Sequence, residues 1–259
     1  MQSVTDHDIV RPNLGPPADI SPGWKRTIDL ACCLAALPLL ALLTVVVALL
    51  TRIASPGPVF FMQERVGYRG RRFLCYKFRT MKCSADTSLH QNHLDELIRT
   101  NAPMTKMDSR RDSRLIPGAW LLRATGLDEL PQIINILRGE MSVVGPRPCL
   151  VYEFEKYLPW QKARTDTQPG LTGLWQVSGK NRLTFEQMIQ LDIEYARTRT
   201  PWLDLKIILM TVPALVLQVS DTRKARKAAA LATPPRSMAP RETPLVNRPS
   251  LHTKQTQLS

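Results

Sequence analysis

The chain has 259 residues, enough for one domain core with appended segments, and a formal net charge of +13. This charge indicates a polyanionic partner, and composition alone does not choose among nucleic acid, anionic lipid and a phosphorylated substrate. The five cysteines are scattered and form no C-x-x-C pair, which argues against a disulfide framework or a zinc site and fits a reducing environment.

The N-terminal part of the chain predicts a flexible lead over residues 1–22 and a membrane element over residues 23–53. Leu30–Leu50 contains no charged residue and has about the length that crosses a bilayer. A cleavable signal peptide is not expected, because the apolar run is long and begins far from Met1.

Two topologies fit this membrane element. Basic residues flank it on both sides, which conflicts with a simple span because basic residues stay on the cytoplasmic side. Pro38, near the middle, would bend a helix. The segment is therefore either a re-entrant hairpin that returns to the same face or a tilted, kinked span.

Residues 54–219 are expected to form the cytoplasmic domain, which begins with a β-hairpin in VFFMQERVGYRGRRFLCYKFRTM. Its turn lies at Gly67–Gly70. In the second strand the alternation places Lys77 and Arg79 on one face, opposite Leu74, Tyr76 and Phe78. The two basic residues could hold a diphosphate, and the alternative is an ordinary solvated strand face.

A helix is predicted after Gly126, because apolar residues follow at spacings of three and four: Leu127, Leu130, Ile134, Leu137 and Met141. Pro131 is tolerated only in its first turn, which places Asp128 and Glu129 near the N-terminus of the helix. Neighbouring carboxylates on a helix diverge, so separate roles are expected. The alternative is a pair of acids that only complements the helix dipole.

Two further residues are candidates for the site. Arg147 lies between Pro146 and Pro148, so its backbone is preorganised, although a simple surface turn fits equally well. Thr184 and Gln187 predict a capping box that begins another helix. Asp192 lies on the apolar face of that helix, where a charge must be paired or bound to metal, and a structural salt bridge is the alternative.

The C-terminal part predicts an interfacial helix over residues 202–219, which are largely apolar with polar residues at one end. Residues 220–259 are predicted to be a disordered basic tail, because they are rich in proline and basic residues without periodicity. The whole chain is expected to be α+β and mostly helical.

An acid pair close to a rigidly presented arginine suits chemistry on phosphates. The arginine can bind phosphate oxygens in a fork, and the acids can bind a metal or attack phosphorus. With a membrane segment upstream, the residues indicate an enzyme that handles a phosphate at a membrane surface.

Four segments together resemble the bacterial sugar transferases, the polyprenyl-phosphate hexose-1-phosphate transferases of monotopic type. The segments are KRTIDL, GPVFFMQERVGYRGRRFLCYKFRTM, LDELPQIINILRGEMSVVGPRP and PGLTGLWQVSGKNRLTFEQM. The resemblance covers roughly residues 23–218, in order. It implies a re-entrant membrane helix broken at a proline, here Pro38, with the catalytic domain on the cytoplasmic face of the bacterial inner membrane.

The resemblance also implies the reaction and its residues. A UDP-hexose gives its sugar-1-phosphate to undecaprenyl phosphate and releases UMP, which loads the first sugar of an exopolysaccharide or related glycan. Asp128 would be the nucleophile that forms a covalent phosphosugar intermediate, and Glu129 would support Mg²⁺, with both acids as metal ligands. Lys77 and Arg79 would contact phosphates, Arg147 the nucleotide end, and Asp192 would complete the polar site.

Two other functions remain as alternatives. A non-catalytic membrane scaffold or regulator could keep this fold, although the intact acids and arginines argue against it. A membrane-tethered nucleic-acid binder is suggested only by net charge, much of which lies in the tail, so no nucleic-acid partner is expected. A homo-oligomer is compatible with the sequence, which does not identify the sugar or the pathway.

Overall fold

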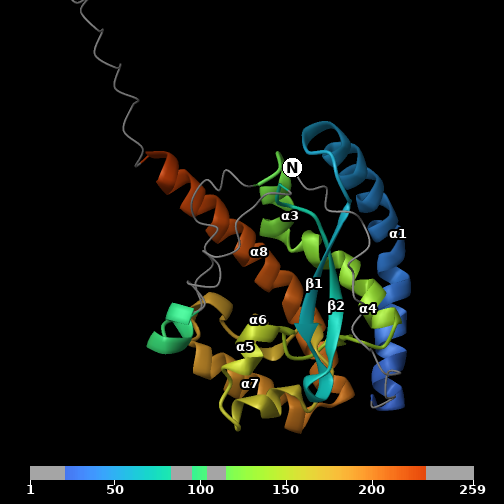
Figure 1. Cartoon of the computed structure of the whole chain (residues 1–259). Coiled ribbons are helices and arrows are strands. Elements are labelled where there is room, and N and C mark those ends of the chain that lie inside the picture. The colour runs from blue at the N-terminus through green and yellow to red at the C-terminus, as the bar shows by residue number, and fades with distance from the viewer. Residues whose placement is uncertain (1–20, 83–94, 104–114, 232–259) are drawn as a thin grey trace, which may run out of the picture.

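The computed structural model describes residues 21–82, 95–103 and 115–231. It is mostly helical, with two small sheets (Figure 1). The α-helices are α1 (Gly23–Ala54), α3 (Ala119–Thr125), α4 (Ile133–Leu137), α5 (Val151–Glu155), α6 (Leu174–Val177), α7 (Phe185–Thr198) and α8 (Pro201–Leu231). Short 3₁₀ helices are η1 (Tyr68–Gly70), η3 (Leu127–Gln132), η4 (Gln161–Thr165) and η5 (Lys180–Arg182). The strands are β1 (Phe60–Val66), β2 (Arg72–Phe78), β3 (Ser142–Val144), β4 (Cys149–Leu150) and β5 (Gly170–Thr172).

The predicted β-hairpin is confirmed and forms the larger sheet. β1 pairs antiparallel with β2, with Met62 opposite Tyr76, and β4 joins the other edge of β1 in the order β2-β1-β4. η1 forms the turn, and Arg69 and Gly70 both have positive φ there. The second sheet pairs β3 and β5 in parallel. This pairing brings the GPRP segment against the PGLTG segment.

Both faces of β2 hold buried residues. Phe73 and Cys75 lie on the face that also carries Lys77, and Phe78 lies on the opposite face with the half-buried Leu74 and Tyr76. Phe73, Cys75 and Phe78 all enter the main hydrophobic cluster. The Lys77 side chain, on the same face as Cys75, is only 15% exposed. The alternative of a solvated basic face is therefore wrong, because this face packs against the domain.

α1 runs along one side of the domain as a 32-residue helix that continues through Pro38 (Figure 1). Its first turns carry the buried Lys25, which donates to Val144 O at 2.8 Å and pairs with Asp204 of α8 at 2.6 Å. One turn later, Asp29 accepts hydrogen bonds from Ser142 and from the backbone of Val143. These buried polar contacts attach the start of α1 to the domain.

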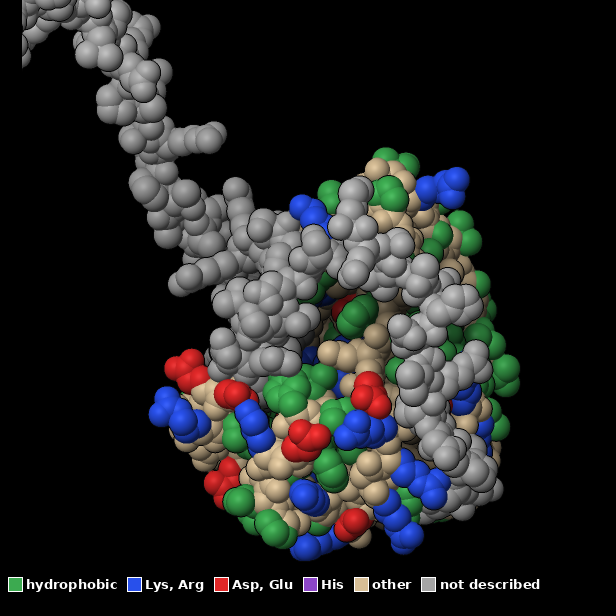
Figure 2. Space-filling model, viewed as in Figure 1, with side chains coloured by type: hydrophobic (Ala, Val, Ile, Leu, Met, Phe, Trp, Pro, Cys, Tyr) green, Lys and Arg blue, Asp and Glu red, His purple; other side chains and the backbone are tan. Residues whose placement is uncertain are grey.

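Large parts of two helices expose apolar side chains. In α1 they include Leu34, Leu42, Val45, Leu49 and Ile53, and hydrophobic side chains line the edge formed by α1 in Figure 2. In α8 they include Trp202, Leu209, Val212, Val216 and Leu217. Gly23–Ala54 and Pro201–Arg223 are each long and apolar enough to cross a membrane. The N-terminal helix is thus compatible with membrane association.

The helix predicted after Gly126 is only partly correct. The chain first forms η3 and only then α4, and Gly139 with φ +76° follows the end of α4. Of the predicted apolar residues, Met141 is buried and Leu130 packs against the main hydrophobic cluster. Ile133 and Ile136 are buried in place of Ile134 and Leu137. A 3₁₀ helix has three residues per turn, so a 3.6-residue period assigns the wrong face.

The structure of α7 and α8 can be compared with the predicted capping box and the predicted disordered tail. The capping box is confirmed, with Thr184 Oγ1 accepting from Gln187 N at 3.3 Å at the start of α7. α8 continues to Leu231, so the predicted disorder is wrong for residues 220–231. That stretch contains alanine, lysine and arginine, which are good helix formers. The lead over residues 1–20 and the tail over residues 232–259 lie outside the described residues.

Candidate functional site

Asp128 and Glu129 lie in the first turn of η3. Gly126, with φ +72°, ends α3 in a left-handed conformation that suits glycine, and Glu129 N donates to Gly126 O at 3.1 Å. η3 packs against β2. This packing places the two acids beside the basic residues of the hairpin.

Glu129 forms the centre of an acid–cation cluster with Lys77 and Arg147. Its Oε1 lies 3.0 Å from Lys77 Nζ and 2.9 Å from Arg147 Nη2, and its Oε2 lies 3.2 Å from Arg147 Nη1. The arginine thus grips the carboxylate with a two-nitrogen fork. The three side chains are 15–34% exposed, so solvent reaches them.

The charges in this cluster hold Glu129 in its ionised form. Burial alone would raise the pKa of Glu129, but the charges and hydrogen bonds of Arg147 and Lys77 outweigh burial and leave the pKa well below its ordinary value. The Glu129 carboxylate in turn raises the pKa of Arg147, and Asp128 adds to this effect. Asp128 is half-buried, and its effect on the pKa of Arg147 shows that it lies within electrostatic reach of this arginine.

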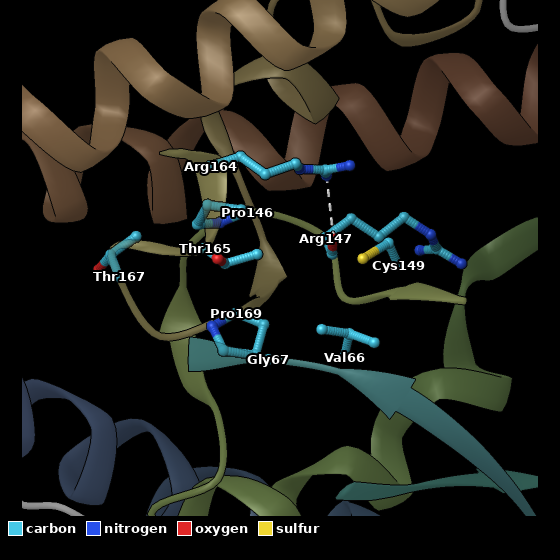
Figure 3. Close-up of a pocket in the computed structure, with 9 residues that line it drawn as sticks. All are labelled: Val66, Gly67, Pro146, Arg147, Cys149, Arg164, Thr165, Thr167 and Pro169. Carbon is cyan, nitrogen blue, oxygen red and sulfur yellow. Dashed lines mark hydrogen bonds between the residues drawn. The ribbon is translucent and has the colours of Figure 1, made fainter. Parts of the chain in front are cut away.

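The proline-flanked loop that carries Arg147 is fixed by close backbone contacts. A Cβ on Gly145 would lie 2.4 Å from Gln168 O, so only glycine fits there. Gly145 N donates to Thr172 O, and Gly170 N donates to Pro146 O. The side chain of Arg147 and those of Arg164 and Thr165 line a small pocket between this loop and the start of the hairpin turn (Figure 3).

Asp192 lies apart from this cluster. It is fully buried on α7 and pairs with Arg164 of η4 at 2.5 Å. Burial raises the pKa of Asp192 to about 6, and the charge of Arg164 opposes the rise. Arg164 Nη2 also donates to Arg147 O at 3.0 Å. Asp192 is thus connected to the cluster only through Arg164 and the backbone.

The Arg79 side chain also lies apart from the cluster of Glu129, Lys77 and Arg147. Its guanidinium donates to the carbonyl oxygens of Ser55 and Pro56, just after α1 ends, and the residue is 6% exposed. The structure therefore brings together Lys77, Glu129 and Arg147, with Asp128 beside them. It attaches Arg79 to the end of α1 and buries Asp192.

A divalent cation would find two adjacent carboxylates here. Among the described residues, no three His, Cys, Asp or Glu side chains gather closely enough to hold a metal ion. Mg²⁺ commonly uses one or two carboxylates together with substrate phosphates and water. From the described residues, Glu129 Oε2 accepts a single hydrogen bond, so this oxygen retains coordinating capacity. The pair of acids fits Mg²⁺ only if a phosphate supplies the remaining oxygens.

Sequence reasoning missed Arg65 and Arg164. Arg65 Nη1 donates to Pro148 O at 3.1 Å, and both arginines are more than 90% buried. A signal for Arg164 existed, because a carboxylate on the apolar face of α7 requires a buried partner. The sequence alone did not show which of many arginines that partner is.

The half-buried acid–cation cluster is suited to phosphate groups, and the two long apolar helices of the chain are compatible with membrane association. The model of the family "Bacterial sugar transferase" matches residues 20–218 of the chain. The chain therefore belongs to the bacterial sugar transferase family.

Several curated relatives are similar to the chain. The exopolysaccharide production protein ExoY of Rhizobium meliloti is 36% identical, with 74% of this chain and 85% of ExoY covered. The UDP-glucose:undecaprenyl-phosphate glucose-1-phosphate transferase of Caulobacter vibrioides is 38% identical, with 74% and 69% covered. The galactosyl transferase CpsE of Streptococcus agalactiae is 42% identical over 62% of this chain, and the matched part spans about a third (35%) of CpsE.

Proposed function

We propose that this protein transfers a hexose-1-phosphate from a UDP-hexose to undecaprenyl phosphate and releases UMP, as the first step of an exopolysaccharide or related glycan. The observation that carries the proposal is the accessible cluster of Glu129, Lys77 and Arg147 beside Asp128. The family membership and the activity for which the Caulobacter relative is named support it.

The reaction has two displacements, and Asp128 is the nucleophile in the first. A carboxylate oxygen of Asp128 attacks the phosphorus next to the sugar, and the bond from that phosphorus to the bridging oxygen breaks. UMP leaves with that oxygen, and an aspartyl phosphosugar remains. An oxygen of undecaprenyl phosphate then attacks the same phosphorus and frees the Asp128 carboxylate. Two displacements by a positioned nucleophile replace one difficult transfer.

Lys77 and Arg147 bind and orient the diphosphate, Arg147 at its nucleotide end, and Glu129 supports Mg²⁺. The guanidinium fork and the ammonium can each pair with phosphate oxygens, and the low pKa of Glu129 keeps this acid ionised at neutral pH. Asp128 and Glu129 would hold Mg²⁺ together with phosphate oxygens. When bound, Mg²⁺ supplies neutralisation of the diphosphate charge.

We also propose that α1 is re-entrant and that the domain faces the cytoplasm at the inner membrane. Both ends of α1 are attached to the same folded domain, at Lys25 by Asp204 and at Ser55 by Arg79. A helix with both ends on one domain is easier to reconcile with one membrane face than with a span. Cysteines introduced near residues 10 and 230 test this arrangement, since labelling from opposite sides would contradict it.

The activity is tested with detergent-solubilised protein, undecaprenyl phosphate, Mg²⁺ and a panel of UDP-sugars, with UMP release as the readout. We expect release with one sugar, loss with a chelator, and at least a thousandfold loss in Asp128→Asn. Asp166→Asn, an exposed acid on the same domain, is the matched control and should keep full activity. If no sugar gives UMP, or if Asp128→Asn still supports glycan synthesis in cells, the results would favour a non-catalytic membrane scaffold instead.

A further inference from the structure

The Pro146–Arg147–Pro148 loop has backbone acceptors that secondary structure leaves unused. Proline contributes no N–H, so such a loop depends on side chains to hold its carbonyl groups. Two buried guanidinium groups do this. Arg164 Nη2 donates to Arg147 O at 3.0 Å, and Arg65 Nη1 donates to Pro148 O at 3.1 Å.

Arg164 is itself held in a buried network. Its side chain is 3% exposed, and it contacts Asp192 Oδ2 at 2.5 Å, Tyr157 Oη at 2.5 Å and Glu153 Oε1 at 3.7 Å. These partners come from α7, from the loop after α5 and from α5 itself. The guanidinium therefore has little freedom, because a buried charge loses much of its stabilisation if it leaves its partners.

Arg147 is thus held at two points. Its carbonyl oxygen faces Arg164, while its side chain extends to one side of that contact (Figure 3) and its guanidinium grips Glu129. A shift of the loop would move the guanidinium away from the carboxylate. Misplacement of a substrate-positioning side chain by about 1 Å can cost a large factor in rate.

The geometry points to Arg164 as a positioning residue, which we propose fixes Arg147 for catalysis through the Arg147 carbonyl, with Asp192 orienting Arg164. This role deepens the proposed transferase function and rests on it. It also gives Asp192 a place in the site without any contact to substrate.

A double-mutant cycle between Arg164→Lys and Arg147→Ala tests the role. Lysine keeps the charge beside Asp192 but lacks the planar guanidinium, in which Nη2 contacts both Asp192 and the Arg147 carbonyl while Nη1 contacts Tyr157. We expect Arg164→Lys to lower kcat/KM about tenfold in the otherwise unchanged protein, and less than twofold when Arg147 is already alanine. Equal losses in the two backgrounds would overturn the proposal, since a purely structural residue acts independently of Arg147.

A second measurement does not depend on activity. The rate at which phenylglyoxal modifies Arg147, followed by peptide mass spectrometry, reports how firmly its guanidinium is held. We expect faster modification of Arg147 in Arg164→Lys and an unchanged rate at the exposed Arg138. An unchanged rate at Arg147 would contradict the positioning role. Absence of UMP release from the unmutated protein would instead count against the proposed function alone.

Discussion

Two arginine–carboxylate pairs of this protein have the same chemistry and opposite environments. Arg147 and Glu129 form a fork whose side chains are 34% and 19% exposed, whereas the side chains of Arg164 and Asp192 are 3% and 1% exposed. A pair that solvent reaches can exchange its partner for a phosphate. A pair inside the domain has no such option, so it fixes the positions of the elements that carry it.

The pKa values of Glu129 and Asp192 shift in opposite directions, because burial and cationic partners balance differently at the two acids. Glu129 has two cationic partners, Lys77 and Arg147, whose effects outweigh burial and lower its pKa. Within the part of the chain that the structure describes, Asp192 is paired only with Arg164, and burial outweighs this single partner, raising the pKa of Asp192 to about 6. In these two carboxylates the direction of the pKa shift follows the number of cationic partners.

The largest effect on stability is expected at the buried pair. Asp192→Ala leaves the Arg164 charge without its closest partner, which typically costs about 3–5 kcal/mol of the free energy of unfolding. Denaturant unfolding in detergent measures the loss, with Asp166→Ala as an exposed control that should change it little. A loss below about 1 kcal/mol would show that the pair is not what holds these elements together.

At the accessible pair we expect the larger effect on activity. Arg147→Ala should lower kcat/KM about 10- to 100-fold, the worth of hydrogen bonds to charged groups, and should cost less of the free energy of unfolding than Asp192→Ala. Arg147→Lys should recover only part of the activity, because an ammonium lacks the fork. Full activity in the lysine variant would remove the geometric argument for this arginine.

The pH dependence of stability should reveal the contribution of the Glu129 carboxylate to the free energy of unfolding. Its pKa is lower in the folded protein than the ordinary value of 4.5, so its stabilising contribution is present above about pH 4.5 and is lost as the pH falls below it. Glu129→Gln should therefore destabilise the protein by about 1–2 kcal/mol at pH 7. The difference in stability between the unmutated protein and Glu129→Gln should become smaller in acid. Melting temperatures of both proteins between pH 7 and pH 3.5 measure this difference, and a constant difference would contradict the lowered pKa.

The smallest effect is expected at a third, exposed pair. Arg72 lies 3.7 Å from both Glu64 and Glu155, and all three side chains are 37–64% exposed. Arg72→Ala should change the free energy of unfolding by less than about 0.5 kcal/mol. This variant is the reference for the other two pairs, because the loss of unfolding free energy in the same assay should increase with the burial of the arginine–carboxylate pair. A larger loss at Arg72 would break that ranking.

Sequence patterns predicted the local elements better than their orientation. The hairpin, the capped helix α7 and the apolar helix α1 follow from turn residues, capping residues and hydrophobic length. Alternation did not show that both faces of β2 hold buried residues, and after Gly126 the periodicity identified Met141 as buried but missed Ile133 and Ile136. Alternation shows that two faces differ, but only packing against another element decides which face is inside.

The residues of the candidate site could be singled out from the chain, because an acid pair, a basic strand and a proline-flanked arginine are local features. Their assembly could not be predicted. Lys77, Glu129 and Arg147 come from three separate elements, and Arg164 and Asp192 are 28 residues apart. The residue types establish what reactions are available. Only long-range packing selects which carboxylate meets two cations at the surface and which is buried with one, because burial and partner number are properties of the folded domain.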